Sequence, residues 1–231
     1  MKSLDLDLVE STAMNSNNIE TNVLEQTNIM HCKGVLTPDE CAVIKEQILE
    51  YKNTQNIDSP DRQMLVNANQ GCWMGQPHFH GGFTDDVESL IVDKIKAGCS
   101  LYYESLPKPK NITQEKHFVD KSDWELWAWA NVNDPGSENR EHTHTGYFLS
   151  GTIYFQSTDT GPIEFLPYQY VYKQTHVDWP YNGTAYYYPE DGDLLLFPSY
   201  LLHKIHKNPS NKQRVNIAFN ATLATDNRIL S

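Results

Sequence analysis

The feature that most constrains the fold is a change of hydrophobic period near residue 124. From there to about residue 223, apolar and aromatic residues alternate with polar ones in short segments, as they do in β-strands. Clusters of Gly, Pro, Asn and Asp separate these segments and mark turns. The expected strands are 124–132, 146–157, 161–167, 184–189, 192–205 and 214–223. The run shows neither βαβ alternation nor an internal repeat, so a parallel α/β sheet is not expected.

Two helices are expected before the strands. In residues 36–53, Thr37 is placed as N-cap, Pro38 follows at the first helical position, and apolar residues then recur at helical spacing. Residues 85–106 show the same spacing, and residues 54–83 between the two helices read as a loop. Helices followed by strands predict a mainly β chain of the α+β class, a sandwich or jelly roll with helices packed on one side.

The chain length favours one domain. The sequence has 231 residues, which suits a single sizeable hydrophobic core. Residues 1–28 are polar and rich in Asn and Ser, so a flexible N-terminal arm is expected. Residues 29–231 are then one domain, in which 29–110 form a helical support region and 111–231 form the jelly-roll core.

Charge and cysteine content exclude some partners. The formal net charge is −12, so there is no cationic excess to bind a nucleic-acid backbone. The four cysteines include no C-x-x-C pair, and the N-terminus has no signal-peptide pattern, which indicates free thiols in a reducing compartment. No apolar run approaches the roughly 20 residues of a membrane span. We therefore expect a soluble, cytoplasmic protein with no membrane partner; the sequence does not predict its oligomeric state.

The segment NREHTHTG, residues 139–146, contains a candidate metal-binding pair. His142 and His144 are one residue apart, so strand alternation puts both side chains on one face. The pair lacks the Asp or Glu that usually accompanies a histidine at this spacing. Two other pairs compete, as does the reading of surface histidines on a polar turn. They are His78 with His80 in a Gly-rich loop and His176 with Asp178, an H-x-D arrangement.

Spacing to a later histidine, His203, favours the pair His142 and His144. In a jelly roll, paired ligands come from an early strand and a single histidine from a late one, with several strands between them. There are 59 positions from His144 to His203, room for about three strands of ordinary length. Only 25 positions separate Asp178 from His203, too few to pass around the barrel. Asp178 remains open as a ligand that reaches in from its loop.

Five short motifs occur in order between residues 124 and 221. They are W-x-N at Trp129 and Asn131, G-x-x-N-x-x-H-x-H from Gly136 to His144, S-G-x-x-Y from Ser150 to Tyr154, G-D-L-x-x-F-P-S-x-x-x-H from Gly192 to His203, and R-x-x-x-x-F-N from Arg214 to Asn220. Each motif alone is unspecific. The ordered set resembles the 2-oxoglutarate/Fe(II) oxygenase superfamily, and most closely the prolyl-hydroxylase-like group of putative oxygenases with an H-x-H motif.

The resemblance implies a fold, a metal and a reaction. The fold would be a double-stranded β-helix, which is a cupin-like jelly roll. The cofactors would be Fe(II), with His142, His144 and His203 as ligands, and 2-oxoglutarate as co-substrate with O2. The reaction would release succinate and CO2 and hydroxylate a C–H bond of a peptide, an amino acid or another small polar substrate. No catalytic residue is expected beyond the metal site.

The resemblance also suggests residues that bind the co-substrate. Arg214 follows His203 by 11 positions, and a bidentate guanidinium suits the distal carboxylate of 2-oxoglutarate. Alternation puts Asn216 on the same strand face as Arg214. Asn131 and Tyr154 are the other residues expected to contact the co-substrate. Residues suggested for the substrate cleft are Trp73, His80, Tyr170 and Trp179.

The missing carboxylate leaves alternatives open. Three neutral imidazoles also suit zinc. In a second register, His144 is the first ligand and Gly146 occupies the carboxylate position, which leaves a coordination position open. Glu141 lies between the two histidines and is expected to point the opposite way. The alternative function is a three-histidine dioxygenase, or a metal-binding jelly-roll protein, that does not use 2-oxoglutarate.

Overall fold

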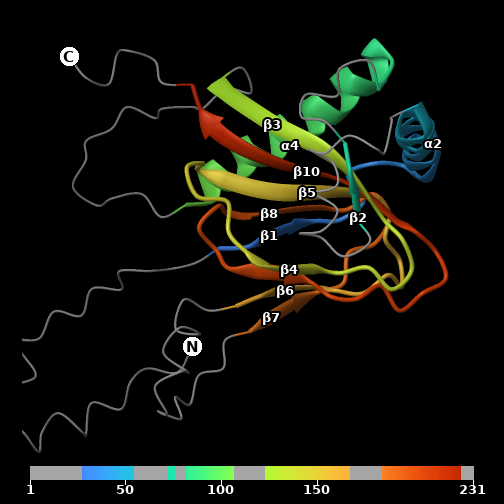
Figure 1. The fold of residues 1–231 in the computed structure, drawn as a ribbon. Helices are drawn as coiled ribbons and strands as arrows, with labels where there is room; N and C mark the ends of the chain where they lie inside the picture. Colours follow the sequence, from blue (N-terminus) through green and yellow to red (C-terminus); the bar gives the residue numbers. More distant parts are fainter. Residues whose placement is uncertain (1–27, 55–71, 76–81, 107–122, 167–183, 225–231) are drawn as a thin grey trace, which may run out of the picture.

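The structure, a computed structural model, describes residues 28–54, 72–75, 82–106, 123–166 and 184–224. Within these ranges the chain forms two antiparallel sheets that face each other, with two helices outside the larger sheet (Figure 1). This arrangement confirms the expected mainly β fold with N-terminal helices. No helix in the described ranges is long and apolar enough to span a bilayer. The expected arm, residues 1–28, lies almost entirely outside them.

Among the described residues, the larger sheet has six strands and the smaller has four. The order in the larger sheet is β1 (Met30–Cys32), β8 (Leu194–Pro198), β5 (Leu149–Gln156), β10 (Arg214–Leu223), β3 (Trp124–Asn133) and β2 (Cys72–Met74). The order in the smaller sheet is β4 (Asn139–His142), β9 (His203–Ile205), β6 (Ile163–Phe165) and β7 (Ala185–Tyr187). The helices are α2 (Pro38–Thr54) and α4 (Asp85–Ser105).

Helix α2 begins where its sequence signal predicts. The Thr37 hydroxyl accepts a hydrogen bond from the Glu40 backbone N–H at 3.3 Å, and the Glu40 carboxylate accepts one from the Thr37 backbone N–H at 2.7 Å. This reciprocal capping box satisfies two backbone donors of the first turn. The hydrogen bonds that the Thr37 backbone N–H and hydroxyl donate to the Glu40 carboxylate lower the pKa of that carboxyl. The start of the helix is therefore fixed locally, by Thr37 and Glu40.

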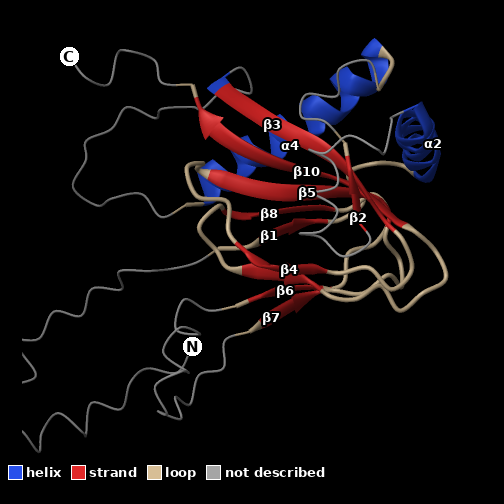
Figure 2. Ribbon diagram, viewed as in Figure 1, coloured by secondary structure: helices blue, strands red, loops and turns tan. Residues whose placement is uncertain are grey.

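The main hydrophobic core lies between the helices and the larger sheet, on one side of it (Figure 2). Ile44 of α2 and Ile91 of α4 are fully buried, and they belong to one cluster with Ile153 of β5, Ile217 of β10 and Val132 of β3. Each fully buried side chain of this size stabilises the fold by about 1.5–3 kcal/mol. This packing supports the larger sheet from the helix side, so side chains on its opposite face are held on a rigid backbone.

Glycine 151 shows how closely this core is packed. A Cβ atom at Gly151 would lie 2.5 Å from the backbone oxygen of Leu195, and it would collide with the ring of Phe219. Phe219 is the register partner of Gly151 on the neighbouring strand, so its ring occupies the space that a side chain would fill. Glycine at this position therefore has a packing role.

On the opposite face of the larger sheet, the strand register arranges side chains in rows. The row of Arg214 contains Cys72, Asn133 and Arg214; the row of Asn216 contains Met74, Asn131, Asn216 and Tyr154; the row of Ala218 contains Trp129, Ala218 and Thr152; the row of Asn220 contains Trp127, Asn220 and Ser150. Successive rows are about 7 Å apart along the strands. This face looks toward the smaller sheet and is mostly polar.

Some element boundaries differ from the expectation. The strand expected over 192–205 is two strands, β8 and β9, which belong to different sheets and are separated by a turn at Ser199 and Tyr200. The strand expected over 146–157 begins only at Leu149. The support region 29–110 contributes two edge strands, β1 and β2, besides its helices. The proposed division of the domain near residue 110 stays a prediction.

Candidate metal centre and adjoining cavity

Three histidines from two strand ends and a loop meet between the sheets. Each of His142, His144 and His203 offers one ring nitrogen, and these three nitrogens lie within 4.8 Å of one another. His142 ends β4, His203 begins β9, and the two are directly opposite in the strand register. His144 lies two residues beyond β4, where its backbone N–H donates to the Ser199 carbonyl at 2.8 Å. The backbone thus fixes all three positions.

Two of these rings are oriented by the backbone. The Nδ1–H of His142 donates to the Arg140 carbonyl at 2.7 Å, and the Nδ1–H of His203 donates to the Leu201 carbonyl at 2.8 Å. Because a carbonyl only accepts, each Nδ1 carries the proton and each Nε2 keeps its lone pair. This is the arrangement by which hydrogen bonds outside a metal site select the tautomer of a ligating histidine.

Two of the rings are held in the neutral form that metal binding needs. Burial, reinforced by the neighbouring His142, lowers the pKa of His144 to about 4. Burial and the same neighbour lower the pKa of His203 to about 3, although its hydrogen bond to Leu201 acts in the opposite direction. Both imidazoles are therefore uncharged at neutral pH and available as ligands.

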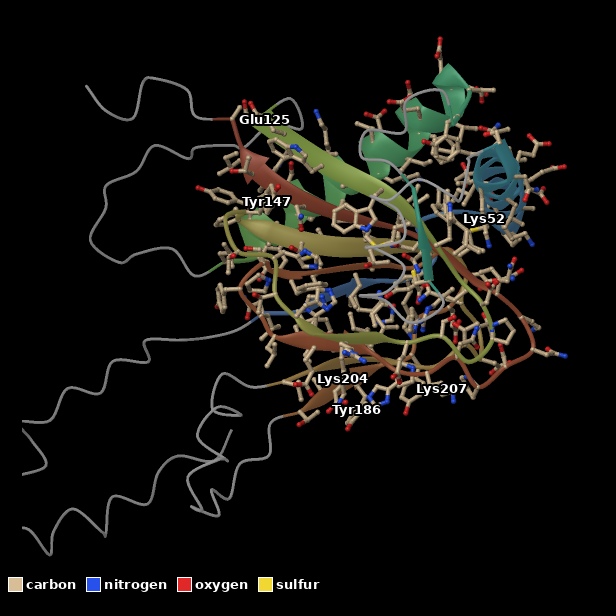
Figure 3. The ribbon with its side chains drawn as sticks, in the orientation of Figure 1. Lys52, Glu125, Tyr147, Tyr186, Lys204 and Lys207 are labelled. Carbon is tan, nitrogen blue, oxygen red and sulfur yellow. The ribbon has the colours of Figure 1, made fainter. Side chains whose placement is uncertain are left out.

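Glu141 points away from the histidines, as alternation predicts. Its carboxylate lies 3.7 Å from the ammonium of Lys204. Lys204 is on the outer side of the smaller sheet (Figure 3), where it also pairs with Glu164 at 2.9 Å. Within the described residues, the histidine group therefore includes no carboxylate.

A cavity of about 380 Å³ adjoins the histidines. It lies between the two sheets. Its walls include side chains from three rows of the larger sheet, those of Arg214, Asn216 and Ala218, together with residues of β4 and β9. Ala218 is the smallest side chain of its row, and it sits between the larger Asn216 and Asn220 on the same strand face. Space is therefore open between the histidines and Arg214.

Arg214 is a buried cation whose hydrogen-bonding capacity is only partly used. Its side chain is 2 % exposed, and its Nη1 donates to the Thr160 carbonyl at 3.2 Å. Its Nη2 has no hydrogen-bond partner, and the described residues provide no carboxylate for it. Burial lowers the pKa of the guanidinium, although Tyr154 and Cys72 act in the opposite direction. A buried cation without an anion is destabilising by several kcal/mol, so this site suits an anionic ligand.

The polar residues of the next row line the same cavity. The Asn131 amide nitrogen donates to the Asn216 side-chain oxygen at 3.0 Å, which links β3 to β10. Burial raises the pKa of Tyr154 to about 12, against the effects of nearby Arg214 and a hydrogen bond with Thr152, so it remains a neutral phenol. Asn131, Asn216 and Tyr154 thus provide neutral hydrogen-bonding groups between the histidines and Arg214.

Other predicted site residues are placed elsewhere or lie outside the described ranges. Trp73 was expected at the substrate cleft, but its ring lies edge-on to Tyr51 in the core beside the helices, with the ring centroids 5.9 Å apart. In β2 it is the next residue, Met74, that lines the cavity. The residues outside the described ranges are His78, His80, Tyr170, His176, Asp178 and Trp179, so their suggested roles stay predictions.

Several cavity residues were not identified as site residues from the sequence. Trp129 lines the cavity, and its ring lies 5.9 Å from that of His144. Its alternation with Asn131 in the W-x-N motif was the available signal. Asn133 and Asn139 also line the cavity, at the end where Arg214 lies. The Thr160 carbonyl that binds Arg214 had no sequence signal, because a backbone acceptor is available at any residue.

The comparison with protein families points to the same part of the chain. Residues 127–220 match the family model described as putative 2OG-Fe(II) oxygenase, where 2OG is 2-oxoglutarate. That range contains all three histidines and Arg214. No curated protein sequence matches the chain.

Solved structures share the fold at low sequence identity. HygX from Streptomyces hygroscopicus, with nickel and 2-oxoglutarate bound, has a TM-score of 0.55 and 12% identity over 86% of this chain and 84% of its own. The prolyl hydroxylase of Trichoplax adhaerens, in complex with a hypoxia inducible factor peptide, has a TM-score of 0.54 and 14% identity over 88% of this chain and 86% of its own. The 2-oxoglutarate-dependent epimerase SnoN from nogalamycin biosynthesis has a TM-score of 0.59 and 12% identity over 86% of this chain and 77% of its own.

Proposed function

We propose that this chain is a 2-oxoglutarate/Fe(II) oxygenase, the family whose model residues 127–220 match. In this proposal His142, His144 and His203 hold Fe(II), and Arg214 binds 2-oxoglutarate. The observation that carries the assignment is the buried guanidinium of Arg214. It faces a cavity that also contains the three histidines, and its Nη2 has no hydrogen-bond partner among the described residues. A dicarboxylate that binds the metal at one end and Arg214 at the other uses both features.

The donor set suits the iron and co-substrate in charge as well as geometry. Three neutral imidazoles leave the 2+ charge of the metal uncompensated by the protein. The dianion 2-oxoglutarate would neutralise that charge and would pair its distal carboxylate with Arg214. Asn131, Tyr154 and Asn216 offer neutral hydrogen bonds to the co-substrate along the way. A carboxylate ligand from the protein is thus not needed for charge balance.

The cofactors define the reaction type. Bound Fe(II) supplies a redox centre at which O2 is consumed while 2-oxoglutarate becomes succinate and CO2 and a substrate C–H bond is oxidised. The protein's part is to bring the three histidine nitrogens together, to keep His144 and His203 neutral, and to fix the distal carboxylate at Arg214. Trp129, whose ring lies 5.9 Å from that of His144, and Met74 also line the cavity and would be available to contact a substrate.

Hydroxylation of a peptide, an amino acid or another small polar molecule is the proposed outcome. The fold supports this class because its structural relatives include a prolyl hydroxylase with a peptide and an enzyme crystallised with hygromycin B. Another relative is an epimerase, so the oxidised C–H bond has more than one fate on this fold. A dioxygenase that needs no 2-oxoglutarate is the second candidate, because three histidines also suit other metals. The unpaired Nη2 of Arg214 argues against it.

The test is anaerobic addition of Fe(II) and then 2-oxoglutarate, followed by visible absorption. We expect a metal-to-ligand charge-transfer band that needs both additions and is absent from the His203→Ala variant. Untargeted screening of metabolites and peptides for succinate release would then identify the substrate. Tight zinc binding without any band on addition of Fe(II) and 2-oxoglutarate would favour the second candidate.

A further inference from the structure

Two residues of the row of Arg214, Asn133 and Arg214 itself, line the cavity. Cys72 of β2, Asn133 of β3 and Arg214 of β10 are register partners across three neighbouring strands. Cys72 and Asn133 are 1 % and 2 % exposed, so they are as deeply buried as Arg214. Any carboxylate that pairs with Arg214 has this row as its boundary.

A chain of hydrogen bonds fixes Asn133 in place. The Cys72 thiol donates to the Asn133 side-chain oxygen at 3.1 Å, and the Asn133 amide nitrogen donates to the Asn139 side-chain oxygen at 2.9 Å. Asn139 begins β4 in the smaller sheet, so this chain joins the two sheets at the Arg214 end. Burial raises the pKa of Cys72 to about 12, even though the nearby Arg214 acts in the opposite direction, so the thiol stays protonated and remains a donor.

This arrangement fixes the side chain of Asn133 as part of the cavity boundary. Its oxygen and its nitrogen are each bound within the protein, and the partners come from two different elements. Its side chain therefore cannot move aside without breaking hydrogen bonds that are buried and expensive to leave unmade. A longer ligand would have to displace it.

We propose that Asn133, positioned by Cys72 and Asn139, sets the chain length of the dicarboxylate that Arg214 accepts. This inference rests on the proposed function. The cavity would accept the five-carbon 2-oxoglutarate and reject the six-carbon 2-oxoadipate, whose additional methylene group must enter the space of Asn133. Asn133 is thus a specificity-determining residue, and Cys72 and Asn139 are positioning residues.

The experiment is anaerobic calorimetry of the Fe(II)-loaded protein with 2-oxoglutarate and, separately, 2-oxoadipate. A single methylene discriminates by about tenfold or more in a closely fitting site. We expect the unmodified protein to prefer 2-oxoglutarate by at least that factor and Asn133→Ala to reduce the preference about tenfold. Cys72→Ser keeps a donor for Asn133 and should keep the preference, whereas Cys72→Ala should weaken it.

Asn220→Ala is the matched control. Asn220 is also a buried asparagine on the inner face, and it accepts a hydrogen bond from Ser150 at 2.8 Å in the row farthest from Arg214. The preference of the Asn220→Ala variant for 2-oxoglutarate over 2-oxoadipate should equal that of the unmodified protein. If Asn133→Ala does not fold, Asn139→Ala, which removes the other anchor, should shift the preference in the same direction.

The outcomes separate this inference from the proposed function. If the unmodified protein binds both acids equally, or if neither asparagine variant at the Arg214 end shifts the preference, Asn133 does not set the length. An equal shift in Asn220→Ala would also overturn the proposal, because it would indicate a general loosening of the barrel. If the unmodified protein binds no 2-oxoglutarate in the presence of Fe(II), the proposed function itself fails.

Discussion

Replacement of Arg214 by methionine should make the ligand-free protein more stable and at the same time abolish its affinity for 2-oxoglutarate. Methionine has a similar length and no charge. In the ligand-free state, the described residues offer the guanidinium one acceptor, the Thr160 carbonyl, and none of them pairs with its buried Nη2. The substitution removes that unpaired charge and leaves one carbonyl that has lost its donor.

The magnitude follows from these two terms. Replacing buried ionic groups with apolar ones of similar volume is often neutral or stabilising by about 1–4 kcal/mol. The lost hydrogen bond to Thr160 offsets about 1 kcal/mol of that gain. A net gain of roughly 0–3 kcal/mol corresponds to a rise in Tm of up to about 12 °C for a domain of this size. For the co-substrate, losing one partner of a buried charge pair costs about 2–5 kcal/mol, which raises Kd roughly 30- to 5,000-fold.

The assay is thermal unfolding of the metal-free protein, together with anaerobic titration of the Fe(II) form with 2-oxoglutarate. Arg214→Lys is the control, since it keeps the charge but not the bidentate geometry, and it should retain part of the affinity. Unchanged affinity in Arg214→Met would remove Arg214 from the site. A large loss of stability in the ligand-free variant would mean that the guanidinium has a protein counter-charge, against the reasoning here.

Three further predictions test the cavity, the core and the histidines. Ala218→Leu should fill the space between the histidines and Arg214, so 2-oxoglutarate binding should weaken by at least tenfold while metal binding is kept. Calorimetry with each ligand checks this, and an affinity for 2-oxoglutarate equal to that of the unmodified protein would place the co-substrate elsewhere. Gly151→Ala should destabilise the fold by about 1–3 kcal/mol, because its Cβ would overlap Phe219 and Leu195; an unchanged urea midpoint would contradict that packing. The metal-free protein should lose stability as the pH falls from 6.5 toward about 4, since the unfolded chain takes up protons at the ordinary histidine pKa of 6.5 while folded His144 and His203 have pKa values of about 4 and about 3. Urea unfolding at several pH values measures the slope, which the double variant His144→Gln/His203→Gln should reduce; an identical slope would refute the assignment.

The sequence predicted the long strands well because each carries many alternating residues. The strand 214–223 matches β10 at both ends, and Arg214 and Asn216 lie on the face opposite Val215 and Ile217 as alternation requires. The strand expected over 124–132 is one residue short of β3. In contrast, β1 and β2 are three residues each, too short to show a period.

Tertiary context explains the remaining differences. A three-residue strand does not reveal which face is buried, so the sequence suggested Trp73 for the cavity where the structure has its neighbour Met74. β4 is polar and charged, and it is a strand because it pairs with β9 across the smaller sheet. The spacing argument selected the three histidines that the structure brings together, but it did not predict that His142 and His203 are register partners.

The central claim is that one ligand spans the three histidines and Arg214. A crystal structure of the protein prepared anaerobically with Fe(II) and 2-oxoglutarate tests it most directly. We expect anomalous density for iron within bonding distance of a ring nitrogen of His142, His144 and His203, and a carboxylate of 2-oxoglutarate hydrogen-bonded to Nη2 of Arg214. Iron bound without one of these histidines, or a co-substrate whose distal carboxylate lies away from Arg214, would contradict it.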